Sequence, residues 1–349
     1  MLGLLEHMKT MINLAVNSDP SEFTVTKTTG QPATYPIARV AMSVIDRRWQ
    51  QFEAFFRQSV DVYSGNYTEP TILQRMQIIS PEQHYPFREQ LSARKRMMSM
   101  GGPFHTNNIR TLPGIFSAII WRAITYRTEF SEAEKMLFVN IDDWNATVSK
   151  IPSAVTGYIC NKAAYGSTNP GRSEKLVPVY WKQVQNLEWE AYCRREETTT
   201  FQDTMRLFSG RNDNPFPHLG LLGAFDLVVD LTYCSKAIHS LPTNMTVAEC
   251  IFKINRGSMN GVMVLNGGNP SARNKRNKAD VAICNATIGK AIEVMHNVID
   301  DTKRADIIID NILAENALLN MITPTTELVT AWTDNIFPNG GHVDNETNS

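Results

Sequence analysis

Residues 219–239 read LGLLGAFDLVVDLTYCSKAIH, and apolar side chains occupy nearly every side of the helix that this stretch predicts. A helix at the surface of a globular protein keeps one polar face, whereas a helix that is apolar all round is buried. We therefore expect this helix to lie at the centre of the core.

Apolar residues recur at helical spacing through most of the remaining chain. A long helix is expected over 37–60, with one apolar face made by Ala41, Ile45, Trp49, Phe52 and Phe56. Further helices are expected over 2–16, 114–126, 178–195, 199–208, 279–300 and 303–322. The last two each carry an apolar stripe, so we expect them to pack against each other as a helical hairpin.

Two local patterns predict where helices begin. Ser131 and Glu134 have the spacing of a capping box before MLFVNI. Thr243 or Thr246 is expected to cap a short helix that ends at Ile254.

Strand signals are weak, and the main one is VMVLN at 262–266, inside a stretch rich in glycine and asparagine. The expected fold class is therefore mostly α: a multi-helix domain with long loops, a flexible N-terminal arm and at most a minor β-hairpin. We expect an N-terminal helix and arm over 1–37, a helical core over 38–338 and a disordered tail over 339–349. Glycine and proline make 150–176 the best candidate for a split in the core.

Composition excludes several classes of protein. The 349 residues carry a net charge of −1 and a pI of about 6.7, whereas a basic nucleic-acid-binding domain has a pI above about 9. Five widely spaced cysteines without a C-x-x-C pair argue against a disulfide framework and a zinc module. No apolar stretch is long enough to span a bilayer. We expect no metal, no cofactor and no membrane partner.

Carboxylates are grouped at two places, Asp142-Asp143 and the string Asp300, Asp301, Asp306 and Asp310. The string resembles the aspartate-rich motifs of prenyl-diphosphate synthases and terpene cyclases, in which carboxylates share Mg²⁺ with a diphosphate. The first pair lacks a third carboxylate one turn later, and the string falls at an expected turn between two helices. A solvated turn is the competing interpretation.

Two basic clusters have no compensating acids nearby in the sequence. One is Arg94, Lys95 and Arg96, and the other is Arg273, Lys275, Arg276 and Lys278. Asn274 and Asn277 lie within the second cluster and add neutral donors for phosphate and sugar oxygens. No aromatic residue accompanies it, so contact with a polyanion would be electrostatic and independent of base sequence. A solvated loop or a subunit contact is the alternative.

The chain as a whole resembles the coat or nucleocapsid proteins of small RNA viruses, of the cryptic-virus kind. The resemblance rests on general features of the chain, which is mostly helical, near neutral in charge and rich in methionine. An N-terminal arm interrupted by prolines and a polar tail flank its helical part. The resemblance implies a capsid subunit that is not an enzyme, has no catalytic residues and forms a large homo-oligomer. It also implies non-specific contact with RNA and a location in the virion or host cytoplasm, but it carries over no functional residue. The expected RNA contacts are therefore the seven residues of the two basic clusters. The alternatives are a Mg²⁺-dependent diphosphate enzyme and a helical adaptor that binds proteins.

Overall fold

The computed structural model describes residues 37–151, 157–160, 172–195, 199–209, 216–217, 219–234, 238, 240–255, 257–268, 280–304 and 306–321. Side chains are described from residue 45 in the first helix and from residue 176 in the helix that begins at Arg172. Within these residues every regular element is a helix, which confirms the mostly α fold class. None of these helices is both long enough and apolar enough to cross a membrane.

The chain divides into two units, each of which is described by itself. Unit 1 comprises residues 1–88 and 247–349, and unit 2 comprises 89–246, so that residues 150–176 lie inside unit 2. The expected arm and tail, apart from the start of the first helix at Ile37, lie outside the described residues.

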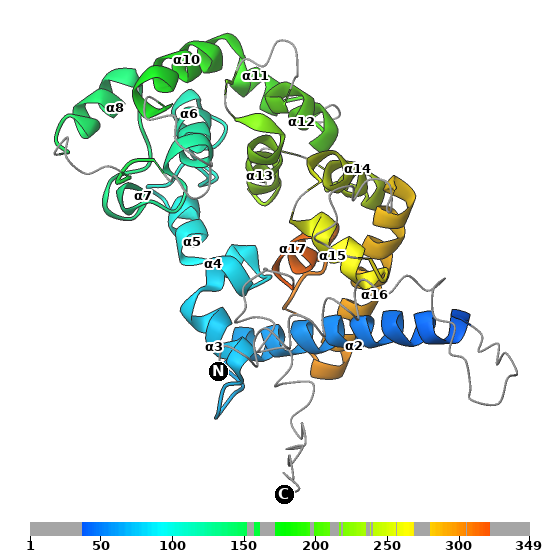
Figure 1. The fold of residues 1–349 in the computed structure, drawn as a ribbon. Coiled ribbons are helices and arrows are strands. Elements are labelled where there is room, and N and C mark those ends of the chain that lie inside the picture. The colour runs from blue at the N-terminus through cyan, green and yellow to red at the C-terminus, as the bar shows by residue number, and fades with distance from the viewer. Residues whose placement is uncertain are drawn as a thin grey trace, which may run out of the picture. The chain divides into compact units, whose positions relative to one another are not determined.

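Unit 1 is built on a long helix near the N-terminus (Figure 1). Its described helices are α2 (Ile37–Ser64), α3 (Ile72–Ile79), α4 (Pro81–His84), most of α14 (Asn244–Ile254), α15 (Ser258–Leu265), α16 (Val281–Thr302) and α17 (Asn311–Asn320). The prediction for α2 is confirmed, since Phe52 and Phe56 are fully buried and Trp49 is nearly so.

The predicted hairpin of α16 and α17 is also confirmed, although α17 begins later than expected. Lys303 ends α16 in the left-handed region, with φ 54°, and the Asp310 carboxylate caps α17. Helix α15 packs against both helices of the hairpin. Gly261 makes the close approach possible, because a Cβ there would lie 2.3 Å from the Leu318 carbonyl oxygen.

Unit 2 has the predicted central helix. Its elements are η1 (Arg88–Gln90, which starts at the boundary), α5 (Ser92–Met98), α6 (Leu112–Ile120), η2 (Trp121–Thr125), α7 (Glu129–Ala133), α8 (Ile141–Val148), α10 (Arg172–Asn186), α11 (Trp189–Cys193), α12 (Phe201–Ser209) and α13 (Gly220–Thr232). Helix α13 is buried along most of its length, as its apolar sequence predicts. The helix expected over 114–126 is α6 together with η2, a π-helical turn.

Two local predictions were wrong. VMVLN is not a strand, because residues 262–265 form the end of α15 and Asn266 is its C-cap. Packing against α17 overrides a weak strand preference there. Ser131 does not begin a helix with Glu134. Ser131 is instead the third residue of the helix, in a capping box with the N-cap Thr128, and Glu134 is the C-cap of that helix. Thr243 does cap α14, since its hydroxyl accepts from the Thr246 N–H at 3.2 Å.

Candidate functional site

The most basic segment of the sequence connects α15 to α16 in unit 1. Its residues Arg273, Lys275, Arg276 and Lys278 lie outside the described residues, but the helix ends on both sides of the segment are described. The geometry of the candidate site therefore rests on these two ends.

The end of α15 is a Schellman turn, in which two N–H groups return to carbonyls of the last helical turn. Gly268 donates to Met263 at 2.7 Å and Gly267 donates to Val264 at 3.0 Å. Gly267 has φ +80°, a conformation that favours glycine over residues with a side chain. The sequence pattern of a Gly-Gly pair before Asn-Pro gave the signal for this ending.

The start of α16 is capped and also tied to the end of α15. The Asp280 carboxylate accepts from the Ile283 N–H at 2.9 Å. The Asn266 amide donates to Thr287 Oγ1 of α16 at 2.8 Å. The end of α15 is therefore tied to α16 at Thr287, and the start of α16 is held by its own cap.

Arg48 of α2 completes this arrangement. Its Nη1 donates to the Val264 carbonyl oxygen at 2.5 Å, and Gly268 O lies 3.4 Å away. The side chain is only 7% exposed, and burial lowers the pKa of Arg48 below its ordinary value. No carboxylate pairs with it among the described residues, so partial charge at the helix end provides its stabilisation.

Two exposed cations lie on the neighbouring helices. Arg47 precedes Arg48 on α2, and the Lys290 ammonium of α16 lies 4.5 Å from the centre of the Trp49 ring. Three residues hold the flanks of the basic segment, and we call them the frame: Arg48, Asn266 and Asp280. Arg47 and Lys290 can favour a polyanion by charge, without reading its bases.

The other basic cluster differs from its prediction, because Arg94 is not on the surface. Its side chain is 2% exposed, and Nη1 pairs with Asp230 Oδ1 at 2.7 Å. Nε pairs with Glu89 at 3.1 Å. Two acids compensate Arg94, Glu89 nearby in the sequence and Asp230 far from it, so Arg94 is corrected from an RNA contact to a core residue. Lys95 is exposed, and Arg96 donates to the Glu134 carbonyl at 2.7 Å.

Arg122 of η2 binds the same carboxylate. Its Nε pairs with Asp230, and its guanidinium lies 4.5 Å and 4.3 Å from the ring centres of Trp121 and Tyr126. The cluster of Arg94, Arg122 and Asp230 is called the arginine network below. Its members are almost fully buried, so it acts within the core.

Several of the grouped acidic residues pair with basic side chains or cap a helix. Asp301 pairs with Arg57 at 2.9 Å, Asp306 pairs with Arg304 at 2.6 Å, and Asp310 caps α17. Asp143 pairs with Lys135 and accepts from the Val139 N–H at 3.0 Å. Among the described residues no group of three or more acids, histidines or cysteines is arranged to hold a metal ion.

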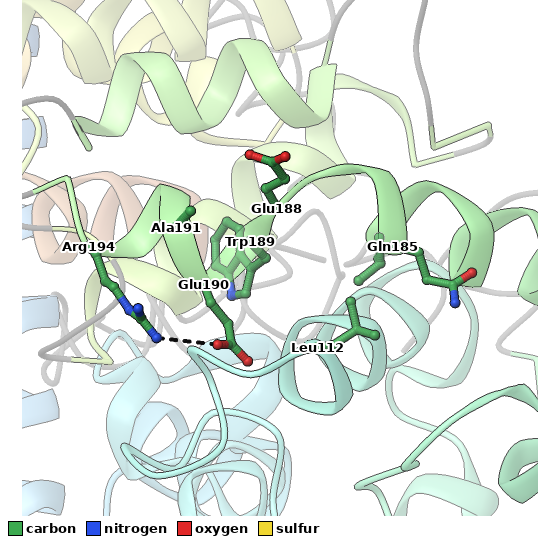
Figure 2. Close-up of a pocket in the computed structure, with 8 residues that line it drawn as sticks. Leu112, Gln185, Glu188, Trp189, Glu190, Ala191 and Arg194 are labelled. Carbon is green, nitrogen blue, oxygen red and sulfur yellow. Dashed lines mark hydrogen bonds and ion pairs between the residues drawn. The ribbon is translucent and has the colours of Figure 1, made fainter.

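A pocket of about 370 Å³ lies in unit 2, between the start of α6 and the junction of α10 with α11 (Figure 2). It is lined by Leu112, Val184, Gln185, Glu188, Trp189, Glu190, Ala191 and Arg194. Glu190 pairs with Arg194 at 3.5 Å, and Figure 2 shows Glu188 pointing away from this pair. The two carboxylates therefore do not form one acid–base centre. No sequence motif signalled this pocket.

The cysteines behave as expected for buried apolar residues. Cys193, Cys234, Cys250 and Cys284 are buried, Cys160 is half-buried, and none of these described cysteines forms a disulfide. Burial raises the pKa of Cys193, Cys234 and Cys250 to about 12, so these thiols stay protonated at neutral pH.

Comparison with known proteins gives no assignment: no family model, curated protein or solved structure matches the chain. Functional conclusions therefore depend on the residues and contacts described above.

Proposed function

We propose that the chain is a viral structural protein, a capsid or nucleocapsid subunit that assembles with copies of itself and encloses or contacts an RNA genome. The frame carries this proposal, because Arg48, Asn266 and Asp280 hold both flanks of the most basic segment of the chain. The expected contacts are Arg273, Lys275, Arg276 and Lys278, with Lys95 and Arg96 as secondary contacts.

The four basic residues of the segment lie between the two flanks in the sequence. Because the helix ends on both sides of the segment are fixed, the segment loses less conformational entropy when it binds a polyanion. Contacts with phosphate oxygens neutralise charge without selecting a base sequence. A near-neutral subunit with one concentrated basic segment suits a shell that touches RNA locally, whereas a protein that coats every nucleotide needs a continuous basic groove.

The partners in this proposal are other copies of the chain and RNA, and its location is the virion or the host cytoplasm. The protein acts without a cofactor and has no catalytic role.

Light scattering after size-exclusion chromatography, with the ratio of absorbance at 260 and 280 nm, tests the proposal. We expect large particles that contain RNA. Replacement of Arg273, Lys275, Arg276 and Lys278 by alanine should lower RNA content and leave assembly intact. The salt dependence of RNA affinity should also become shallower by a log–log slope of about 3, since four phosphate contacts are lost.

A matched control removes the same charge elsewhere. Lys182, Arg194, Arg195 and Arg206 are exposed residues of unit 2, and their replacement by alanine should leave RNA content unchanged. A monodisperse monomer free of nucleic acid would overturn the proposal. Metal-dependent turnover that Asp301→Asn abolishes would favour the enzyme, and unchanged RNA content in the basic-segment variant would favour the adaptor.

A further inference from the structure

The pocket of about 370 Å³ in unit 2 takes no part in the proposed function (Figure 2). Its volume lies in the range of small-molecule sites, which combine an apolar lining with a few charged groups. Helices α6, α10 and α11 and the junction of the last two contribute to it, all within unit 2. The chemistry of this lining indicates the class of molecule that the pocket can hold.

The apolar part of the lining is fixed by the core. Trp189 is 1% exposed, and its Nε1 donates to the Ile109 carbonyl oxygen at 2.7 Å. The Trp189 ring also stacks on Tyr192, with 5.4 Å between the ring centres. Val184 is fully buried and Leu112 is half-buried. A ligand that enters the pocket therefore does not have to order these side chains first.

Glu188 brings an uncommitted carboxylate to the pocket. It stands at the N-cap position of α11, but its side chain makes no capping hydrogen bond, and it has no ion pair with another described residue. Its backbone lies in the left-handed region, with φ 47° and ψ 43°. Any side chain makes this conformation costly, and glycine is the residue that suits it. The turn between α10 and α11 therefore gives no reason for a glutamate at this position.

A second carboxylate, that of Glu190, lines the pocket at a separate point. Figure 2 shows Glu188 and Glu190 pointing in different directions, as residues two positions apart near the start of a helix do. Glu190 Oε2 pairs with Arg194 Nη2 at 3.5 Å, but these side chains are 56% and 75% exposed, so water weakens the pair. A carboxylate accepts several hydrogen bonds, so Glu190 can bind another cation as well.

Charge and geometry exclude other ligand classes. The charged groups of the lining are Glu188, Glu190 and Arg194, so the net charge is −1, which disfavours an anion. Carboxylates that diverge cannot share one metal ion, and the described residues contain no cluster of three metal ligands. A ligand that fits must carry positive charge at two separate points and apolar surface between them.

We propose that the pocket binds a linear aliphatic diamine or oligoamine. One ammonium group pairs with each carboxylate, and the methylene chain lies along the apolar lining. Methylene chains of this kind pack on apolar surface while their ammonium groups stay in water, as those of lysine do. Pairs with exposed carboxylates are weak, so we expect a dissociation constant on the order of 0.1–1 mM at low salt. This site goes beyond the proposed function and does not depend on it.

Three ligands with the same carbon chain test this chemistry by isothermal titration calorimetry at low ionic strength. They are cadaverine with two ammonium groups, pentylamine with one, and pentanediol with none. We expect cadaverine to bind saturably, pentylamine to bind about fivefold more weakly, and pentanediol not to bind. Pentylamine also stands for a lysine side chain of a protein. Equal affinity for cadaverine and pentylamine would overturn the diamine site in favour of a single ammonium group.

Two changes at Glu188 separate binding from folding. Glu188→Gly removes the carboxylate and suits the left-handed backbone, so cadaverine affinity should fall about fivefold without a fall in melting temperature. Glu188→Gln keeps the size of the side chain and should lose the same affinity. Glu132→Gln is the matched control, since Glu132 is an exposed residue of unit 2 outside the pocket. Equal affinity of Glu188→Gln and Glu132→Gln would overturn the inference.

Arg194→Gln should act in the opposite direction. The change removes the cation that competes for Glu190 and makes the lining more negative, so cadaverine affinity should rise about twofold to fivefold. Pentanediol should still not bind, because it has no charge. A loss of cadaverine affinity in Arg194→Gln would overturn the role of Glu190 in the site.

The outcomes separate this inference from the proposed function. Saturable cadaverine binding by a protein that forms no large particle and holds no RNA would keep the pocket site and overturn the proposed function. RNA-containing particles whose subunits do not bind cadaverine saturably would overturn the pocket site alone.

Discussion

Both units bury arginine, but they stabilise it differently. In unit 2, Arg94 and Arg122 share the carboxylate of Asp230. In unit 1, Arg48 meets carbonyl oxygens at the end of α15, and no carboxylate pairs with it among the described residues. Buried arginines can therefore be stabilised in different ways, which depend on the groups that the fold places next to them.

The pKa shifts show the same difference. Burial is the largest influence on the pKa of Arg94 and Arg122 and lowers it, but Asp230 together with Glu89 at Arg94 and Asp226 at Arg122 outweighs burial, so that both pKa values are raised. Burial also lowers the pKa of Arg48, and no nearby acid reverses the shift. The charges of the arginine network are balanced by Asp230 within the core, whereas the charge of Arg48 is met only by carbonyl oxygens at the end of α15.

Asp230→Asn should have the largest effect. The change leaves two buried guanidinium groups without their shared carboxylate, so we expect unfolding free energy to fall by about 3–5 kcal/mol. Urea unfolding monitored by circular dichroism measures this loss.

A triple variant sharpens this test. Arg94→Met, Arg122→Met and Asp230→Leu together remove every charge of the network, so stability should lie closer to wild type than for Asp230→Asn alone. A near-neutral result for Asp230→Asn would show that the network contributes little.

Arg48→Met should have an intermediate effect. It removes a charged hydrogen bond to the end of α15, with an expected loss of about 2 kcal/mol, because no opposite charge is left unpaired among the described residues. The measurement is the shift in the urea midpoint. Arg47→Met is the matched control, since it removes the same charge from the exposed neighbouring position. Equal losses in the two variants would contradict the role assigned to Arg48.

Lys95→Ala should have the smallest effect. Lys95 follows Arg94 in the sequence but is exposed, so we expect a change within about 0.5 kcal/mol. The measurement is the melting temperature of Lys95→Ala compared with that of Arg94→Ala. A loss similar to that of Arg94→Ala would show that the cluster acts as one unit.

Much of the helical architecture could be predicted from the sequence. Apolar spacing located α2 and the buried α13, because helical periodicity is a local property of the chain. The same reasoning did not find α3, whose Ile72, Met76 and Ile79 form a stripe that is exposed instead of buried. Periodicity identifies a face, but the partner of that face is set by contacts elsewhere.

The candidate site also combines features that the sequence predicts with features that only the tertiary structure reveals. The Gly-Gly pair and Asp280 are local signals for the helix ends that flank the basic segment. The contact of Arg48 with Val264 joins residues 216 positions apart, and no local pattern indicates it. The pocket at Glu188 also escaped prediction, because it depends on how α6 meets the junction of α10 and α11.

The sequence by itself determined that the protein is mostly helical, where its principal helices lie and where positive charge is concentrated. Only the tertiary structure decided that Arg94 is buried and that α3 presents isoleucine to solvent. The physical reason is distance along the chain: Arg94 meets Asp230 across 136 positions, and Gln77 of α3 is held by Ser59 of another helix. Local spacing determines a helix, whereas burial depends on partners that only folding brings into contact.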